Sequence, residues 1–176
     1  MHQNVEIFEY GGGGSTLFFL NRAKRVITVE HDPVWFDLIR DNIRPNKSNR
    51  WQGNLIEPEC PVITAGLDKS MPSDCYSGVS KFQNATFKSY SHFIDNFSDA
   101  CFDMILIDGR ARTSCLYKAI DKVKSGGYLI LDNSERSYYL KHNAKLLKNT
   151  YRLLLHEMAA VPYDRCFSRT SIWQKL

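Results

Sequence analysis

The chain has 176 residues, which is enough for one α/β domain with a hydrophobic core, and 43% of them are hydrophobic. It has no apolar run of about 18 residues, as a membrane-spanning helix requires, and no basic-then-apolar segment typical of a signal peptide. The formal charge of +4 permits an anionic substrate or RNA without requiring either. These features argue against an integral membrane or secreted protein and predict a soluble, cytoplasmic one.

The first predicted strand ends in an acid and leads into a glycine-rich loop. Residues 5–10 are largely apolar, and Gly11–Gly14 follow, with Ser15 and Thr16 after them. Glycines let the backbone approach a ligand, and the hydroxyl pair suits the start of a helix whose free N–H groups point at it. The carboxylate of Glu9 would repel a dinucleotide pyrophosphate and attract the ammonium group of a methionine moiety. The loop therefore favours S-adenosylmethionine over NAD, and a surface turn without a ligand is the alternative.

A second strand and helix follow at the spacing of a nucleotide-binding unit. Residues 25–30 are rich in β-branched side chains and end in Glu30, where such units place a carboxylate on ribose hydroxyls. A helix then begins, with Asp32 suited to its N-cap and Pro33 to its first turn. Three apolar residues share one face of this helix and are predicted to pack on the sheet rather than stack on adenine: Trp35, Ile39 and Ile43.

The regular pattern lapses between residues 44 and 84, where four prolines and three glycines break any long element. A third strand crosses this segment near residues 61–65 or near residues 54–56, and the sequence does not decide between them. Long loops in compact domains are usually functional or disordered. We therefore expect either a flap that covers the substrate or a disordered insertion.

After this segment, residues 87–96 are predicted to form an amphipathic helix. Residues 102–109 are predicted to form a buried strand, in which Asp108 is the last acid. The next helix is predicted from apolar residues that recur at helical spacing as far as Val123. Residues 124–127, with the sequence Lys-Ser-Gly-Gly, are predicted to end it.

The C-terminal third continues the same alternation. A strand at residues 128–131 precedes Asp132 and Asn133, a helix is predicted near 137–149, and two strands near 151–157 and 167–174 finish the chain. Alternating strands and helices predict a doubly wound parallel sheet that binds ligands at the carboxyl ends of its strands. Four acids fall at such ends: Glu9, Glu30, Asp108 and Asp132.

With these motifs in order, nearly the whole chain resembles the class I S-adenosylmethionine-dependent methyltransferases. Glu9-x-Gly11-x-Gly13-x-Ser15 is similar to the family's first motif, Glu30 to its ribose acid, and residues 102–108 to its fourth-strand motif. The resemblance implies a Rossmann-like, seven-stranded sheet with an antiparallel last strand. It also implies S-adenosylmethionine as cofactor, bound by Glu9, Gly11, Gly13, Ser15, Glu30, His31 and Asp108.

One departure concerns the start of the chain, because family members usually carry helices before the first strand that help to cover the cofactor. Here the first strand begins at about Val5. We expect either a trimmed chain or a cofactor pocket that is covered by the segment 44–84 or by a second subunit.

Two arrangements are open for the chemistry, of which the first is implied by the resemblance and the second follows from the residues themselves. Metal-dependent O-methyltransferases of the family use an acid after the fourth strand and an Asp-Asn pair after the fifth, and Asp108, Asp132 and Asn133 match those positions, which implies a Mg²⁺ site. Asp108, Asp132 and Arg110 are the candidate catalytic residues. Alternatively, three arginines hold a carboxylate or phosphate of the acceptor: Arg110, Arg112 and Arg136.

The sequence as a whole predicts a single domain over residues 1–176 with a loop-rich insertion around 44–84. We expect methyl transfer to a small-molecule acceptor, most plausibly at oxygen, and no membrane partner; a homo-oligomer stays open. An RNA methyltransferase is the first alternative, with phosphates held by Arg110, Arg112 and a basic helix face that consists of Lys141, Lys145, Lys148 and Arg152. A non-catalytic or truncated relative of the same fold is the second.

Overall fold

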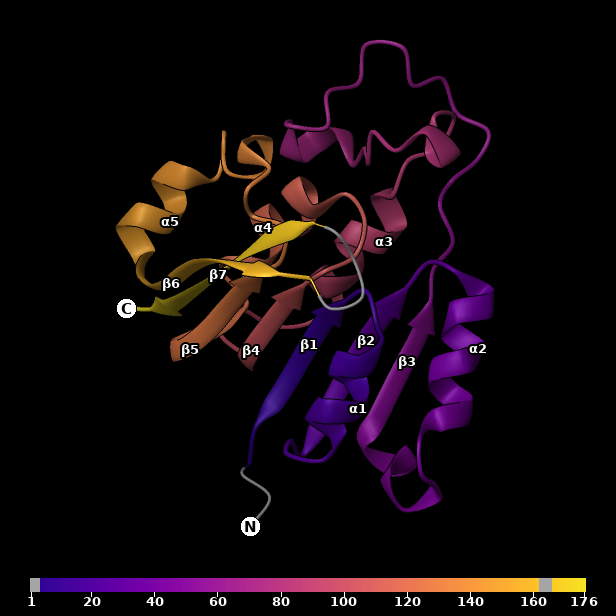
Figure 1. Ribbon diagram of the computed structural model, residues 1–176, viewed down its shortest axis with the longest axis vertical. Coiled ribbons are helices and arrows are strands. Elements are labelled where there is room, and N and C mark those ends of the chain that lie inside the picture. The colour runs from indigo at the N-terminus through magenta and orange to yellow at the C-terminus, as the bar shows by residue number, and fades with distance from the viewer. Residues whose placement is uncertain (1–3, 162–165) are drawn as a thin grey trace.

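The computed structural model describes residues 4–161 and 166–176, and its centre is a seven-stranded sheet in the order β3-β2-β1-β4-β5-β7-β6 (Figure 1). The first five strands run parallel, whereas β7 is antiparallel to both β5 and β6. The predicted seven-stranded sheet with an antiparallel last strand is therefore confirmed. The strands are β1 (Glu6–Tyr10), β2 (Arg25–Glu30), β3 (Trp51–Leu55), β4 (Phe102–Ile107), β5 (Val123–Leu131), β6 (Tyr151–Ala160) and β7 (Phe167–Lys175).

Two groups of helices cover the two faces of the sheet. On one face, Leu20 of α1 packs with Ile7 and Val26 of the sheet. On the other face, Tyr90 and Leu116 belong to the large aromatic and aliphatic core that also contains side chains from β1, β4 and β5. The helices are α1 (Gly14–Leu20), α2 (Pro33–Asn42), α3 (Lys88–His92), α4 (Arg112–Ala119) and α5 (Ala144–Thr150).

The helix α2 begins as the sequence predicts. The side chain of Asp32 accepts hydrogen bonds from the backbone N–H groups of Val34 at 3.1 Å and Trp35 at 3.2 Å, and Pro33 occupies the first helical position. This cap fixes where the chain leaves β2, and so places the residues between β2 and α2 at the edge of the sheet.

The third strand is Trp51–Leu55, so the alternative at residues 61–65 is wrong. A six-residue 3₁₀ helix at Pro45–Arg50 precedes it. From Ile56 to Asn84 the chain contains two short 3₁₀ helices, Pro72–Asp74 and Ser80–Phe82, and is otherwise irregular. This part of the chain lies over the ends to which the parallel strands point (Figure 1).

The predicted end of the fourth helix is also wrong. The helix α4 ends at Ala119, and residues 124–127 belong to β5 together with Val123. Gly126 has φ +77°, and the register between β4 and β5 shifts beside it, so the glycines form an irregularity in a strand rather than a helix end. Glycine at positive φ suits both structures, which is why the sequence signal was ambiguous.

The C-terminal helix is shorter than predicted, because a 3₁₀ helix at Ser137–Tyr139 is separate from α5. In the described parts of the chain, residues 4–161 and 166–176, no helix is both long and apolar enough to cross a bilayer.

Candidate functional site

A cavity of about 330 Å³ lies where the carboxyl ends of β1, β2 and β4 meet. Gly11 and Gly12 line it from the loop after β1, and Glu30 lines it from the end of β2. Asp108 and Arg110 line it after β4. A volume of this size is typical of small-molecule sites, and the edge at which it opens is where open α/β sheets bind ligands. We call it the cofactor cavity.

The structure brings only some of the predicted cofactor residues to this cavity. Gly11, Glu30, His31 and Asp108 line it, whereas Glu9, Gly13 and Ser15 do not. The contribution of the last three to binding therefore stays a prediction.

The glycine loop is built by contacts within the protein. Gly11 has φ +83°, and a Cβ there would lie 2.7 Å from the backbone of Gly109 in the loop after β4. The N–H of Gly11 bonds to the carbonyl of Val29, that of Gly12 to Glu30, and that of Gly13 to Thr16. These three N–H groups are therefore not available to a pyrophosphate, unlike those of a dinucleotide-binding loop.

Glu9 lies beneath the loop and is fully buried. Its carboxylate accepts hydrogen bonds from Ser15 at 2.9 Å, from Thr28 at 2.8 Å and from Thr16. Burial raises the pKa of Glu9 to about 7, although these three hydrogen bonds lower it. Because Thr16 also accepts from the N–H of Gly13, Glu9 positions the loop from below.

We expect Glu9→Gln to change how stability depends on pH. A carboxyl group whose pKa is raised from 4.5 to about 7 on folding stabilises the protein below pH 4.5, and this contribution is lost as the pH rises through 7. The free energy of unfolding of Glu9→Gln minus that of wild type should therefore increase by about 3 kcal/mol when the pH is raised from 4.5 to 8. Urea unfolding at both pH values measures this, with exposed Glu57→Gln as the control.

The same variant tests the predicted contact with the cofactor ammonium. Because the Glu9 carboxylate is enclosed by hydroxyl groups, we expect affinity for S-adenosylhomocysteine within a few-fold of wild type. A relative stability that does not vary with pH would contradict the raised pKa of the buried Glu9 carboxyl group.

Glu30 closes the other side of the cavity and is held by the backbone. Its carboxylate accepts from the N–H groups of Gly12 at 3.0 Å, His31 at 2.7 Å and Asp32 at 3.0 Å, and it lies 2.6 Å from the imidazole of His31. Burial alone would raise the pKa of Glu30, but the hydrogen bonds from His31 and Asp32 outweigh burial and lower it. Glu30 is thus a fixed negative charge in the wall of the cavity.

The prediction that Trp35 packs on the sheet is wrong. Its side chain is 48% exposed and lines the cavity, and its indole N–H donates to the carbonyl of Gly12 at 2.8 Å. Ile39, one turn later, is buried as predicted. The position of Trp35 in the first turn of α2, next to the edge that holds ligands, was the signal that could have identified it.

Arg112 joins the two acids that follow β4 and β5. It is 8% exposed, and its guanidinium donates to Asp108 Oδ1 at 2.9 Å and lies 3.8 Å from Asp132 Oδ2. It also donates to the backbone carbonyls of Asp108, Gly109 and Asp132. Partial burial raises the pKa of Asp108 to about 6, although its side chain is 46% exposed; Arg112 lowers this pKa and Asp132 raises it.

This arrangement leaves the predicted metal residues poorly placed for a cation. The positive guanidinium of Arg112 already contacts both Asp108 and Asp132, and the side chain of Asn133 donates to Ser168 at 2.7 Å. Within the described residues, no group of three or more His, Cys, Asp or Glu side chains could hold a metal ion. Asp132 itself accepts from Thr170 at 2.9 Å and does not line the cavity.

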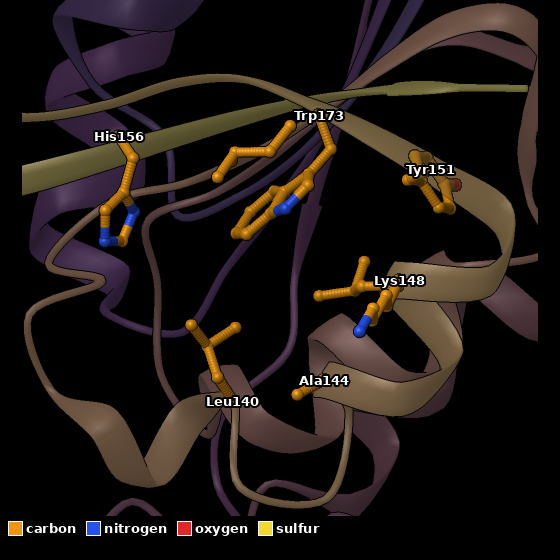
Figure 2. Close-up of a pocket in the computed structure, with 8 residues that line it drawn as sticks. Leu140, Ala144, Lys148, Tyr151, His156 and Trp173 are labelled. Atoms are coloured by element: carbon orange, nitrogen blue, oxygen red, sulfur yellow. The ribbon is translucent and has the colours of Figure 1, made fainter.

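A separate apolar cavity of about 320 Å³ lies between α5 and the strands β6 and β7 (Figure 2). Leu147, Leu153 and Trp173 line it, together with Lys148 of the basic helix face. It shares no residue with the cofactor cavity. Of the predicted basic face, Lys145 and Lys148 lie on α5 and Lys148 lines this apolar cavity, whereas Lys141 precedes the helix.

No protein-family model matches the chain, and no curated protein matches it either. Solved structures do match, and several of them are methyltransferases by name. An rRNA methylase from Streptococcus thermophilus superposes with a TM-score of 0.64 and 11% identity, over 98% of this chain and 88% of that chain. An O-methyltransferase from Bacillus cereus, in complex with SAH, superposes with a TM-score of 0.63 and 18% identity, over 97% of this chain and 74% of that chain.

A third match is the N-methyltransferase NodS from Bradyrhizobium japonicum, with a TM-score of 0.57 and 11% identity, over 97% of this chain and 85% of that chain. The chain therefore has the class I methyltransferase fold, as the sequence motifs predict. Since these proteins differ in the acceptor that their names give, the fold does not identify the acceptor.

Proposed function

We propose that the protein transfers a methyl group from S-adenosylmethionine to an oxygen atom of a small-molecule acceptor. The observation that carries this proposal is the cofactor cavity, formed by the glycine loop, Glu30 and Asp108 at the carboxyl ends of β1, β2 and β4. The fold match to methyltransferases, one of them holding SAH, supports the choice of cofactor.

The lining of the cavity fits this cofactor better than a dinucleotide. The wall carries the carboxyl groups of Glu30, Asp32 and Asp108, which suit a ligand with hydroxyl groups and a positive charge. A pyrophosphate would meet these carboxyl groups, while the N–H groups of Gly11 to Gly13 are already bonded within the protein. The exposed indole of Trp35 adds an apolar surface beside the loop.

When bound, S-adenosylmethionine supplies an electrophilic methyl group on a sulfonium. The protein has to align the acceptor hydroxyl with that methyl group and remove its proton as the new C–O bond forms and the C–S bond breaks. Asp108 is the group we assign to the proton, because it lines the cavity and its pKa of about 6 leaves it mostly ionised at neutral pH while still basic enough to accept.

A magnesium ion does not fit this site, so no step depends on one. Mg²⁺ requires several oxygen ligands in octahedral geometry. Arg112 instead supplies the positive charge between Asp108 and Asp132, and its fixed guanidinium would repel a cation there. Turnover is therefore expected to persist in EDTA.

RNA as acceptor has weaker support from the contacts. Arg112, one of the arginines considered for binding phosphate, is buried and bonded to two carboxyl groups. Lys148 of the basic face lines the apolar cavity, and no residue of that face lines the cofactor cavity. An RNA acceptor would be recognised by binding whose affinity falls steeply with salt.

We expect the Asp108→Asn variant to lose about 100-fold in turnover while keeping its affinity for S-adenosylhomocysteine within a few-fold. Because the base must be ionised, kcat/KM of wild type should fall as the pH is lowered through about 6. Mass-spectrometric detection of methyl transfer to a panel of hydroxylated small molecules provides the assay. Asp132→Asn, outside the cavity, is the matched comparison, and an equal loss in both variants would contradict the assignment of the proton to Asp108.

A further inference from the structure

A second, smaller cavity adjoins the cofactor cavity, and it is lined by cations and tyrosines. Its volume is about 20 Å³, and it shares Gly109, Arg110 and Arg112 with the cofactor cavity. The remaining polar lining comes from two segments that are distant in sequence: Lys69, Tyr76 and Ser77 from residues 56–84, and Arg136, Tyr138 and Tyr139 from the residues after β5. We call it the basic cavity.

The positive charges of the basic cavity are only partly balanced. Arg112 is neutralised by Asp108 and Asp132, and Arg136 has Glu135 at 3.8 Å. Among the described residues, no carboxylate forms an ion pair with Lys69 or with Arg110, although other cations of the chain have such partners. Charges that face a cavity without a counter-charge attract an anion to it.

Both unbalanced cations are held beside aromatic rings. The ammonium group of Lys69 lies 4.4 Å from the ring centre of Tyr138. The guanidinium of Arg110 lies 5.6 Å from the ring centre of Phe82, and its Nε donates to Nε2 of His31 at 3.4 Å. These contacts position the cations without neutralising them.

The protein also fixes the walls that carry these groups. Thr113 at the start of α4 donates to the backbone carbonyl of Lys69 at 2.7 Å, which ties the long segment to the edge of the sheet. Arg136 donates to the hydroxyl of Tyr139 at 3.1 Å. The cavity is therefore built from contacts that span the fold, and its position does not depend on one flexible loop.

We propose that the basic cavity binds a single anionic group, a carboxylate or a phosphate, of the methyl acceptor. One part of this proposal, that the anionic group belongs to the methyl acceptor, rests on the proposed function. A cavity of about 20 Å³ suits one terminal group and not a whole substrate. Lys69, Arg110 and Arg136 supply the donors, and the rest of the acceptor then extends past Gly109 into the cofactor cavity.

The test measures thermal unfolding with sodium phosphate or sodium acetate at constant ionic strength, with chloride as the reference salt. We expect phosphate, acetate or both to raise the Tm of wild type, and Lys69→Met to weaken that binding about tenfold. Arg136→Met is a second variant with the same expected loss. Lys145→Met, at an exposed position on α5, should behave as wild type.

The two anions distinguish a phosphate site from a carboxylate site. Equal shifts in wild type and Lys69→Met, or no shift beyond chloride, would overturn the proposal. Titration of the same samples with S-adenosylhomocysteine tests the proposed function separately. Wild type and the three variants should bind S-adenosylhomocysteine with the same affinity. Anion binding without any binding of S-adenosylhomocysteine would mean that the link to a methyl acceptor has failed.

Discussion

Replacing Arg112 with methionine is expected to destabilise the protein by about 2–3 kcal/mol at pH 8, because a buried charged donor is lost from two partly exposed acids. The side chain is 8% exposed and bridges Asp108 to Asp132. Without it, two neighbouring carboxyl groups face each other, and three backbone carbonyls lose their donor. Urea unfolding measures the loss.

The loss should be smaller at pH 5 than at pH 8. Removing the guanidinium raises the pKa of Asp108 further, because Arg112 is the group that lowers it. A carboxyl group with a raised pKa stabilises the folded state at low pH and loses this contribution as the pH rises.

Arg40→Met is the matched control, because Arg40 also contacts two acids, Asp37 at 2.8 Å and Asp41 at 3.2 Å, but is 55% exposed. Its loss should stay below about 1 kcal/mol. A loss for Arg112→Met no greater than that of the control would contradict the role of Arg112 as the charge that holds the two acids together.

Most of the sheet could be predicted from the sequence because most strands carry their own local signal, whereas the place of β3 and the start of β5 were not fixed by such a signal. The near-continuous apolar runs of β2 and β4 match strands that are buried on both faces, and the acids at their ends mark the edge of the sheet. The N-cap of α2 was likewise local, since Asp32 and Pro33 act within one turn.

The site was predicted less completely because its chemistry depends on contacts that the sequence does not contain. Glu9 and Asp108 both follow the expected pattern, but only the packing of Thr16 and Thr28 encloses Glu9. The bridge from Arg112 to Asp132 spans 20 residues and brings a positive charge to the acids for which the sequence predicts a metal. Lys69 comes from an irregular segment that has no motif, so its place beside Arg110 could not be predicted.

Gly11→Ala is expected to destabilise the protein by about 3 kcal/mol and to abolish measurable cofactor binding. The backbone at φ +83° is strained for any residue with a Cβ, and that Cβ would lie 2.7 Å from the backbone of Gly109. Both glycines line the cofactor cavity, so relief of the clash would move its walls. Gly14→Ala is the control, because a Cβ at Gly14 has no neighbour within 4 Å and alanine favours a helix.

The most direct measurement is a calorimetric titration of S-adenosylhomocysteine into wild type, Gly14→Ala and Gly11→Ala, each shown to be folded by circular dichroism at the titration temperature. The proposed cofactor cavity predicts one binding site per chain in wild type and Gly14→Ala, no measurable binding in Gly11→Ala, and no competition by NAD. Folded wild-type protein that binds NAD instead, or that leaves S-adenosylhomocysteine unbound at millimolar concentration, would contradict the assignment of this cavity to S-adenosylmethionine.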